Sequence, residues 1–286
     1  MEVNQANLNQ TSTKLPINDR LMDAATIWPQ IEAEAEAAIK REPILAHPLR
    51  QMVLETSSLA EAMAVRLSRK LHREELPREV MQPLFYEVMQ EHPEFVDQMA
   101  CDIDAIVERD PACASPLEPL LYFKGFHAIS THRLAHALWL NGRKDLAFYL
   151  QSVSSEVFAT DIHPAARIGC GILLDHATSC VIGETAIIER DVSILHEVTL
   201  GGTGKESGDR HPIVRSGVMI GAGAKILGRV EIGTCSKIGS GSVVLADVPP
   251  HTTVAGVPAI VVGTSAEDSP AHQMNQMLEC QAKKKS

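Results

Sequence analysis

The chain has 286 residues, a formal net charge of −10 at pH 7 and only 4% aromatic residues. This length allows two domains with hydrophobic cores, and the scarcity of aromatic residues indicates that aliphatic side chains fill those cores. The acidic balance argues against a nucleic-acid-binding protein, because such proteins present basic surfaces.

Residues 1–19 are polar, rich in Asn, Gln and Thr, and predicted to be disordered. They contain no apolar signal core, and no run in the chain approaches the ~18 apolar residues that a membrane helix needs. The six cysteines are scattered without a Cys-x-x-Cys pair, which predicts reduced thiols. These features together predict a cytoplasmic protein that binds no membrane.

Residues 20–158 are predicted to form an all-helical domain. Residues 31–39 consist of strong helix formers. Pro77 and Pro93 are expected near helix starts, because an acidic residue follows each within the first turn. Asn141-Gly142 predicts the end of a later helix.

An aliphatic residue recurs every six positions through most of residues 159–263. A period of six is typical of a parallel β-helix, in which each unit is one short strand and a tight turn. Three units make one triangular coil, and stacked coils bury the aliphatic column. Thirteen positions fit the period, and each is Ile, Leu or Val: Ile162, Ile168, Leu174, Ile182, Ile188, Ile194, Leu200, Val214, Ile220, Ile226, Ile232, Ile238 and Val244.

The period breaks twice, and insertions in a solenoid form loops that often make its binding face. Leu174 and Ile182 are eight positions apart in place of six. Leu200 and Val214 are fourteen apart in place of twelve, so the segment between them is predicted to protrude. Residues 264–286 are polar and predicted to form a flexible tail.

The first break contains a candidate general base, His176, preceded by Asp175. An imidazole is a natural base near neutral pH, and a carboxylate can fix its tautomer and stabilise its cation. Asp161 is fifteen residues before His176, which predicts adjoining coils and nearly the same corner. Asp and His are also ordinary turn residues, but Asp175 and the register break together favour a functional site.

The second break contains Arg210-His211 in a glycine-rich segment. Arginine can bind a carboxylate through two parallel hydrogen bonds, and glycines let backbone N–H groups approach a ligand. The alternative is a solvated surface loop, and Gly-Gly-Thr-Gly without a strand–helix context is a weak phosphate-loop signal.

Two further groups of residues give weaker indications of a functional site. His163, His176, His196 and His211 could form a zinc site, but their spacings contain no His-x4-His, so no metal is expected and His196 is expected to have no catalytic role. Ala222 and Ser240 are eighteen apart, which stacks them on successive coils and could leave a groove for a pantetheine arm. Turns need small residues in any case, so this feature alone favours a purely structural role.

Taken together, these segments resemble the serine acetyltransferases, hexapeptide-repeat enzymes that start cysteine synthesis. The repeat alone would indicate only an acyltransferase-like solenoid. Two further segments, Arg109-Asp110-Pro111 and Gly208-Asp-Arg-His-Pro212, narrow the resemblance to the acetyltransferases that act on serine. It covers nearly the whole chain and also rests on residues 120–127, 161–166, 174–177, 198–205, 217–228 and 255–259.

The resemblance implies an α+β chain in which the helical domain precedes a left-handed parallel β-helix. It also implies acetyl-CoA as cosubstrate and L-serine as acceptor. The implied roles are His176 as base with Asp161 as its partner, Asp110 and Asp175 for the serine ammonium, Arg210 and His211 for its carboxylate, and Gly202, Ala222, Lys237 and Ser240 for coenzyme A.

The resemblance further implies inhibition by L-cysteine and trimers, or dimers of trimers, with the active site between subunits. Two other readings stay open: acetyl transfer to another hydroxyl, of homoserine or a sugar, and a non-catalytic scaffold. The chain departs from the family pattern at Ile260, where many relatives carry Arg or Lys. It also ends in Lys285-Ser286 where relatives end in isoleucine, so no tight complex with O-acetylserine sulfhydrylase is expected.

Overall fold

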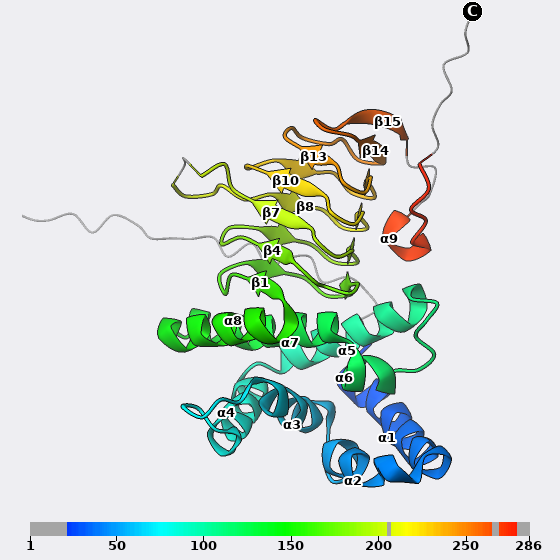
Figure 1. Cartoon of the computed structure of the whole chain (residues 1–286), viewed down its shortest axis with the longest axis vertical. Coiled ribbons are helices and arrows are strands. Elements are labelled where there is room, and N and C mark those ends of the chain that lie inside the picture. The colour runs from blue at the N-terminus through cyan, green and yellow to red at the C-terminus, as the bar shows by residue number, and fades with distance from the viewer. Residues whose placement is uncertain (1–21, 205–206, 265–268, 279–286) are drawn as a thin grey trace, which may run out of the picture.

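The computed structural model describes residues 22–204, 207–264 and 269–278. The predicted disordered segment 1–19 and the Lys285-Ser286 end lie outside these ranges. Helices form one domain and short strands form a solenoid stacked on it (Figure 1). The helices are α1 (Ala24–Arg41), α2 (Ala46–Leu49), α3 (Leu59–Leu71), α4 (Arg78–Glu91), α5 (Pro93–Arg109), α6 (Leu117–Tyr122), α7 (Lys124–Leu140), α8 (Lys144–Phe158) and α9 (Pro270–Gln273).

Local signals set the helix ends. The side chain of Asp23 caps α1 by accepting a hydrogen bond from Thr26 N. Helix α5 begins at Pro93, and α4 begins directly after Pro77. Helix α7 ends before Asn141-Gly142, where the glycine has φ of +76°. The predicted helix boundaries at the two prolines and at Asn141-Gly142 are therefore confirmed.

The solenoid has three sheets, named here A, B and C. All pairings within them are parallel except the terminal β14–β15 hairpin. Sheet A holds β1 (Thr160–Ile162), β4 (Cys180–Ile182), β7 (Thr199–Gly201), β10 (Lys225–Leu227) and β13 (Val243–Val244). Sheet B holds β2 (Arg167–Ile168), β5 (Ile187–Ile188), β8 (Ile213–Val214) and β11 (Glu231–Ile232). Sheet C holds β3 (Leu173–Leu174), β6 (Ser193–Ile194), β9 (Met219–Ile220), β12 (Lys237–Ile238), β14 (Thr252–Ala255) and β15 (Ile260–Thr264).

The six-residue column points into the solenoid and forms its core. In sheet A, Ile162 pairs with Ile182, which pairs with Leu200, and the column continues to Ile226 and Val244. All five side chains are buried. The predicted succession of a helical domain and a parallel β-helix is confirmed.

The pairing of strands in neighbouring coils gives the number of residues that each of the two insertions adds to its coil. Thr160 pairs with Cys180, so the first coil has two residues beyond the regular eighteen. Thr199 pairs with Lys225, which adds eight residues. The spacing of fourteen in place of twelve predicted two extra residues in the second break. The structure shows instead that Leu200 and Val214 are consecutive members of the column, with no repeat unit between them.

A buried ion pair fastens the helical domain to the first coil. Arg133 of α7 donates to Asp102 of α5 over 2.5 Å, and both side chains are almost fully buried. The same guanidinium donates to the carbonyl oxygens of Ile168 and Gly169, while Asp102 accepts from Ile172 N at 2.8 Å. Both partners are thus satisfied by several hydrogen bonds, as a buried pair requires.

Part of the predicted flexible tail is packed against the solenoid. Ser193 donates to Ala271 O at 2.8 Å, and Lys237 donates to Met277 O at 2.7 Å. Helix α9 also contacts α5. Residues 269–278 therefore lie along sheet C, because backbone carbonyls of the tail find donors there. Among the described residues, no helix is long and apolar enough to cross a bilayer.

Candidate active site

The predicted site residues fall mainly on two edges of the solenoid. Edge CA is the line of turns leading from strands of sheet C into sheet A, and edge AB is the line leading from sheet A into sheet B. Edge CA carries Asp175, His176, His196, Ala222 and Ser240. Edge AB carries His163, Glu184, Gly202, Arg210 and His211.

On edge CA, His176 stands out from the turn after β3 with three quarters of its side chain exposed. Its Nε2 lies 3.7 Å from Asp175 Oδ1. Burial raises the pKa of the Asp175 carboxyl, and the nearby Asp110 carboxyl adds to the rise while His176 opposes it. This edge therefore gathers two carboxylates beside one exposed imidazole.

The start of α7 fixes the turn that carries His176. Lys124 donates to Thr178 Oγ1 over 2.5 Å, and Thr160 donates to Ala177 O over 3.0 Å. Gly125 approaches so closely that a Cβ on it would lie 1.9 Å from Leu174 O. The two-residue insertion is thus held by the helical domain directly beneath it.

The turns of edge CA form one hydrogen-bonded ladder. Backbone N–H groups donate from Glu197 to Thr178, from Gly223 to His196, and from Gly241 to Ala222, each over 2.8–2.9 Å. Ala222 and Ser240 therefore lie in line with His176, as the spacing of eighteen predicts. His196, for which no role was expected, has its ring centroid 5.9 Å from that of His176.

On edge AB, Arg210 and His211 are both engaged. Arg210 donates to Glu184 Oε2 at 2.7 Å. His211 Nδ1 accepts from Thr185 N at 3.2 Å, which places the ring proton on Nε2. Burial, with a smaller contribution from Arg210, lowers the pKa of His211. Gly202 packs against Arg210, since a Cβ there would lie 3.3 Å from Arg210 Cγ.

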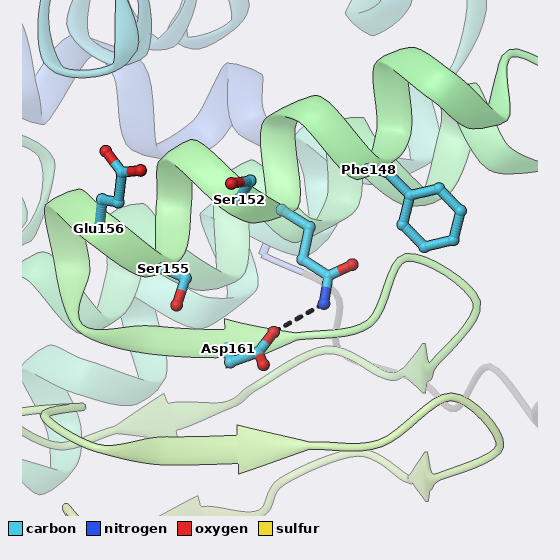
Figure 2. Close-up of a pocket in the computed structure, with 6 residues that line it drawn as sticks. Phe148, Ser152, Ser155, Glu156 and Asp161 are labelled. Carbon is cyan, nitrogen blue, oxygen red and sulfur yellow. Dashed lines mark hydrogen bonds between the residues drawn. The ribbon is translucent and has the colours of Figure 1, made fainter.

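Asp161 does not reach His176 within one chain. It lies in β1 beside α8, lining a cavity of about 480 Å³, where Gln151 Nε2 donates to Asp161 Oδ1 over 2.6 Å (Figure 2). Among the described residues, no hydrogen bond or ion pair joins Asp161 to His176. Asp161 pairs with Val181, five positions after His176, and the two-residue insertion accounts for two of those five positions. The role of Asp161 as partner of His176 stays a prediction.

Lys237, for which a contact with coenzyme A was predicted, does not lie on edge CA with Ala222 and Ser240. It is a buried residue of β12 in sheet C, and its ammonium donates to the carbonyl of Met277 in the tail. That carbonyl takes one of the three N–H donors of the ammonium, so contact of Lys237 with a coenzyme A phosphate stays a prediction. Across residues 22–204, 207–264 and 269–278, no group of three His, Cys, Asp or Glu side chains could hold a metal ion.

Gln151 is a residue that the sequence does not reveal. A single glutamine on a helix reads as a solvated surface residue, and it carries no motif. Only the packing of α8 beside β1 brings its amide to Asp161.

The chain matches known families over both of its domains. Residues 27–131 match the family described as serine acetyltransferase, N-terminal, and residues 211–246 match the bacterial transferase hexapeptide family of six repeats. A serine acetyltransferase of Salmonella typhimurium is 52% identical over 250 residues, which cover 87% of this chain and 92% of that protein.

Three similar solved structures contain bound small molecules. Serine acetyltransferase of Brucella abortus in complex with coenzyme A is 54% identical with a TM-score of 0.82, covering 84% of this chain and 96% of that chain. A serine acetyltransferase in complex with cysteine is 50% identical with a TM-score of 0.87, covering 88% and 98%. The soybean enzyme complexed with serine is 51% identical with a TM-score of 0.81, covering 82% and 97%.

Proposed function

Because the chain belongs to the serine acetyltransferase family, we propose that it acetylates the hydroxyl of L-serine to give O-acetyl-L-serine, the first step of cysteine biosynthesis. It is an acyltransferase with acetyl-CoA as cosubstrate, and its solenoid is the left-handed β-helix of hexapeptide proteins. Cys101, Cys113, Cys170 and Cys180 carry free thiols, which supports a cytoplasmic location.

One observation carries this proposal: the chain presents groups for both charges of an amino-acid zwitterion, one set beside the candidate base His176 and the other on edge AB. Asp110 and Asp175 lie on the side of His176 and can bind an ammonium. Arg210 and His211 offer N–H donors to a carboxylate. A sugar acceptor would give these charged groups no partner.

The two sets of groups lie on different edges, so we infer that the site is completed by a second copy of the chain. In a closed trimer around an axis parallel to the solenoid, edge CA of one subunit can adjoin edge AB of the next. Sheet A lies between these edges and would face the axis. This arrangement brings Asp161 and Arg210 of one subunit toward His176 of its neighbour. Such trimers can pair through their helical domains into hexamers.

In the proposed reaction, His176 removes the proton from the serine hydroxyl as its oxygen attacks the acetyl carbonyl carbon. Asp161 of the adjoining subunit stabilises the imidazolium that forms. The tetrahedral intermediate then loses coenzyme A as the C–S bond breaks, and its electron pair goes to sulfur. His176 returns the proton to that thiolate.

The acceptor is tested by thiol release from acetyl-CoA with serine, homoserine or a galactoside. We expect rapid release with serine and at most background release with the other two acceptors. The His176→Ala variant is the control for non-enzymatic hydrolysis. Equal or faster release with homoserine or the galactoside would contradict the proposal.

Arg210→Ala should mainly impair the use of serine. A hydrogen bond to a charged group contributes about 1.5–3 kcal/mol, so kcat/KM for serine should fall about 10- to 100-fold, while KM for acetyl-CoA changes little. Steady-state kinetics with each substrate varied measures both constants. Arg167→Ala, at an exposed position of sheet B, is the matched control and should leave both unchanged. An effect confined to acetyl-CoA would place Arg210 on the cosubstrate side.

L-Cysteine should inhibit competitively with serine. It carries the same ammonium and carboxylate, so it can occupy the groups proposed for serine. Initial rates at several serine and cysteine concentrations measure the pattern, and D-cysteine is the control because its inverted centre misplaces one charged group. No inhibition at millimolar L-cysteine would contradict the proposed pocket.

Gln151→Met should lower kcat by roughly tenfold, because the variant keeps the side-chain length but removes the donor that orients Asp161. KM for serine should stay nearly constant, since Gln151 does not contact the proposed zwitterion site. Ser155→Ala, in the same cavity (Figure 2), is the control and should behave like the wild type. An unchanged kcat in Gln151→Met would show that the Asp161 carboxylate needs no such support.

A further inference from the structure

His196 occupies a position on edge CA that the proposed reaction does not yet use. The backbone ladder of this edge places its turn directly between the turn of His176 and the turn of Ala222. The rings of His196 and His176 meet edge to face, with an interplanar angle of 69°. Any group that reaches His176 along this edge therefore passes His196.

The side chain of His196 is poised to donate from one nitrogen. Its Nδ1 is buried and has no hydrogen-bond partner. Protonated Nδ1 would leave a buried N–H without an acceptor, which is rarer and costlier in proteins than an unpaired acceptor. The favoured tautomer thus carries its proton on Nε2.

The turns beyond His196 leave room for a thin ligand. Ala222-Gly223 and Ser240-Gly241 follow along the same edge, and nothing lies within 4 Å of a Cβ placed on Gly241. Successive coils are about 4.8 Å apart, so an arm lying past Ser240 and Ala222 would bring its end to His196 within one further coil. Its reactive end would then lie between His196 and His176.

We propose that His196 donates its Nε2–H to the thioester sulfur of acetyl-CoA. This rests on the proposed function and adds a group for the leaving thiolate. When the C–S bond breaks, the electron pair moves to sulfur and the hydrogen bond from His196 strengthens. The proton that sulfur finally gains is the one that His176 took from serine, and His196 keeps its own.

The test compares the binding of coenzyme A with that of desulfo-coenzyme A, which lacks the sulfur. Calorimetry at pH 9, where an alkyl thiol is substantially ionised, gives the ratio of their dissociation constants. We expect the wild type to prefer coenzyme A by about threefold to tenfold, the usual effect of one hydrogen bond. His196→Ala should reduce the ratio to about one, and His196→Gln, which keeps a donor, should retain most of it.

His251→Asn is the matched control, because His251 is an exposed turn residue elsewhere on the solenoid with φ of +53° that asparagine tolerates. It should keep the wild-type ratio. An unchanged ratio in His196→Ala, or a wild type without preference for coenzyme A, would overturn the contact. Failure of the proposed function is a separate result: the wild type would release no thiol with serine, whatever the binding ratio.

Discussion

His176→Ala is expected to lower kcat by about 10²–10⁴-fold, the usual contribution of a positioned general base. Without the imidazole, water must take the proton of the serine hydroxyl and no group returns it to the departing thiolate. Thiol release with saturating serine and acetyl-CoA measures the effect. The loss should appear in kcat, because the carboxylates and the arginine proposed to bind serine are unchanged.

His176→Asn is the companion variant that separates chemistry from folding. His176 has φ of +56°, a region that asparagine and histidine tolerate better than alanine does. His176→Asn should melt close to the wild type, because the side chain is largely exposed and asparagine tolerates this backbone conformation. Turnover within twofold of the wild type in either variant would exclude His176 as the base.

Arg133→Met is expected to destabilise the fold by about 3–5 kcal/mol, the usual cost of removing one partner of a buried ion pair. The substitution leaves Asp102 buried without its counter-ion, and the carbonyls of Ile168 and Gly169 lose their donor. Equilibrium urea unfolding of the wild type and the variant at one protein concentration measures the difference.

Arg133→Met combined with Asp102→Asn is the control for this mechanism. The asparagine removes the unpaired charge but keeps an acceptor for Ile172 N. The double variant should therefore be less destabilised than Arg133→Met alone. A loss below about 1 kcal/mol in Arg133→Met would show that this pair does not fasten the helical domain to the first coil.

The fold is predictable because local rules and the global architecture agree. A six-residue period admits essentially one way of burying Ile182, Leu200 and Ile226, and these side chains do form a single column in the core. Proline and glycine positions likewise mark helix ends through their fixed backbone preferences. The charged residues of the site are also visible, since their types match the chemistry of a zwitterion.

The spatial relations of the site are less predictable. The distance from Asp161 to His176 depends on how many residues each insertion adds to a coil, and the sequence does not state which repeats are absent. Gln151 and His196 acquire their places only through packing of α8 and stacking of turns. Lys237 is bonded to the tail because a distant segment folds back on sheet C, which no local pattern signals.

The central claim is that each active site joins edge CA of one subunit to edge AB of another. The direct measurement mixes two impaired variants, His176→Ala and Arg210→Ala, by joint unfolding and refolding, and assays thiol release at a serine concentration well below KM. In a trimer with shared sites, each mixed trimer contains one intact site, so an equal mixture should recover about a quarter of the wild-type activity. Activity no higher than the mean of the two separate variants would show that each chain holds a complete site and would contradict the account.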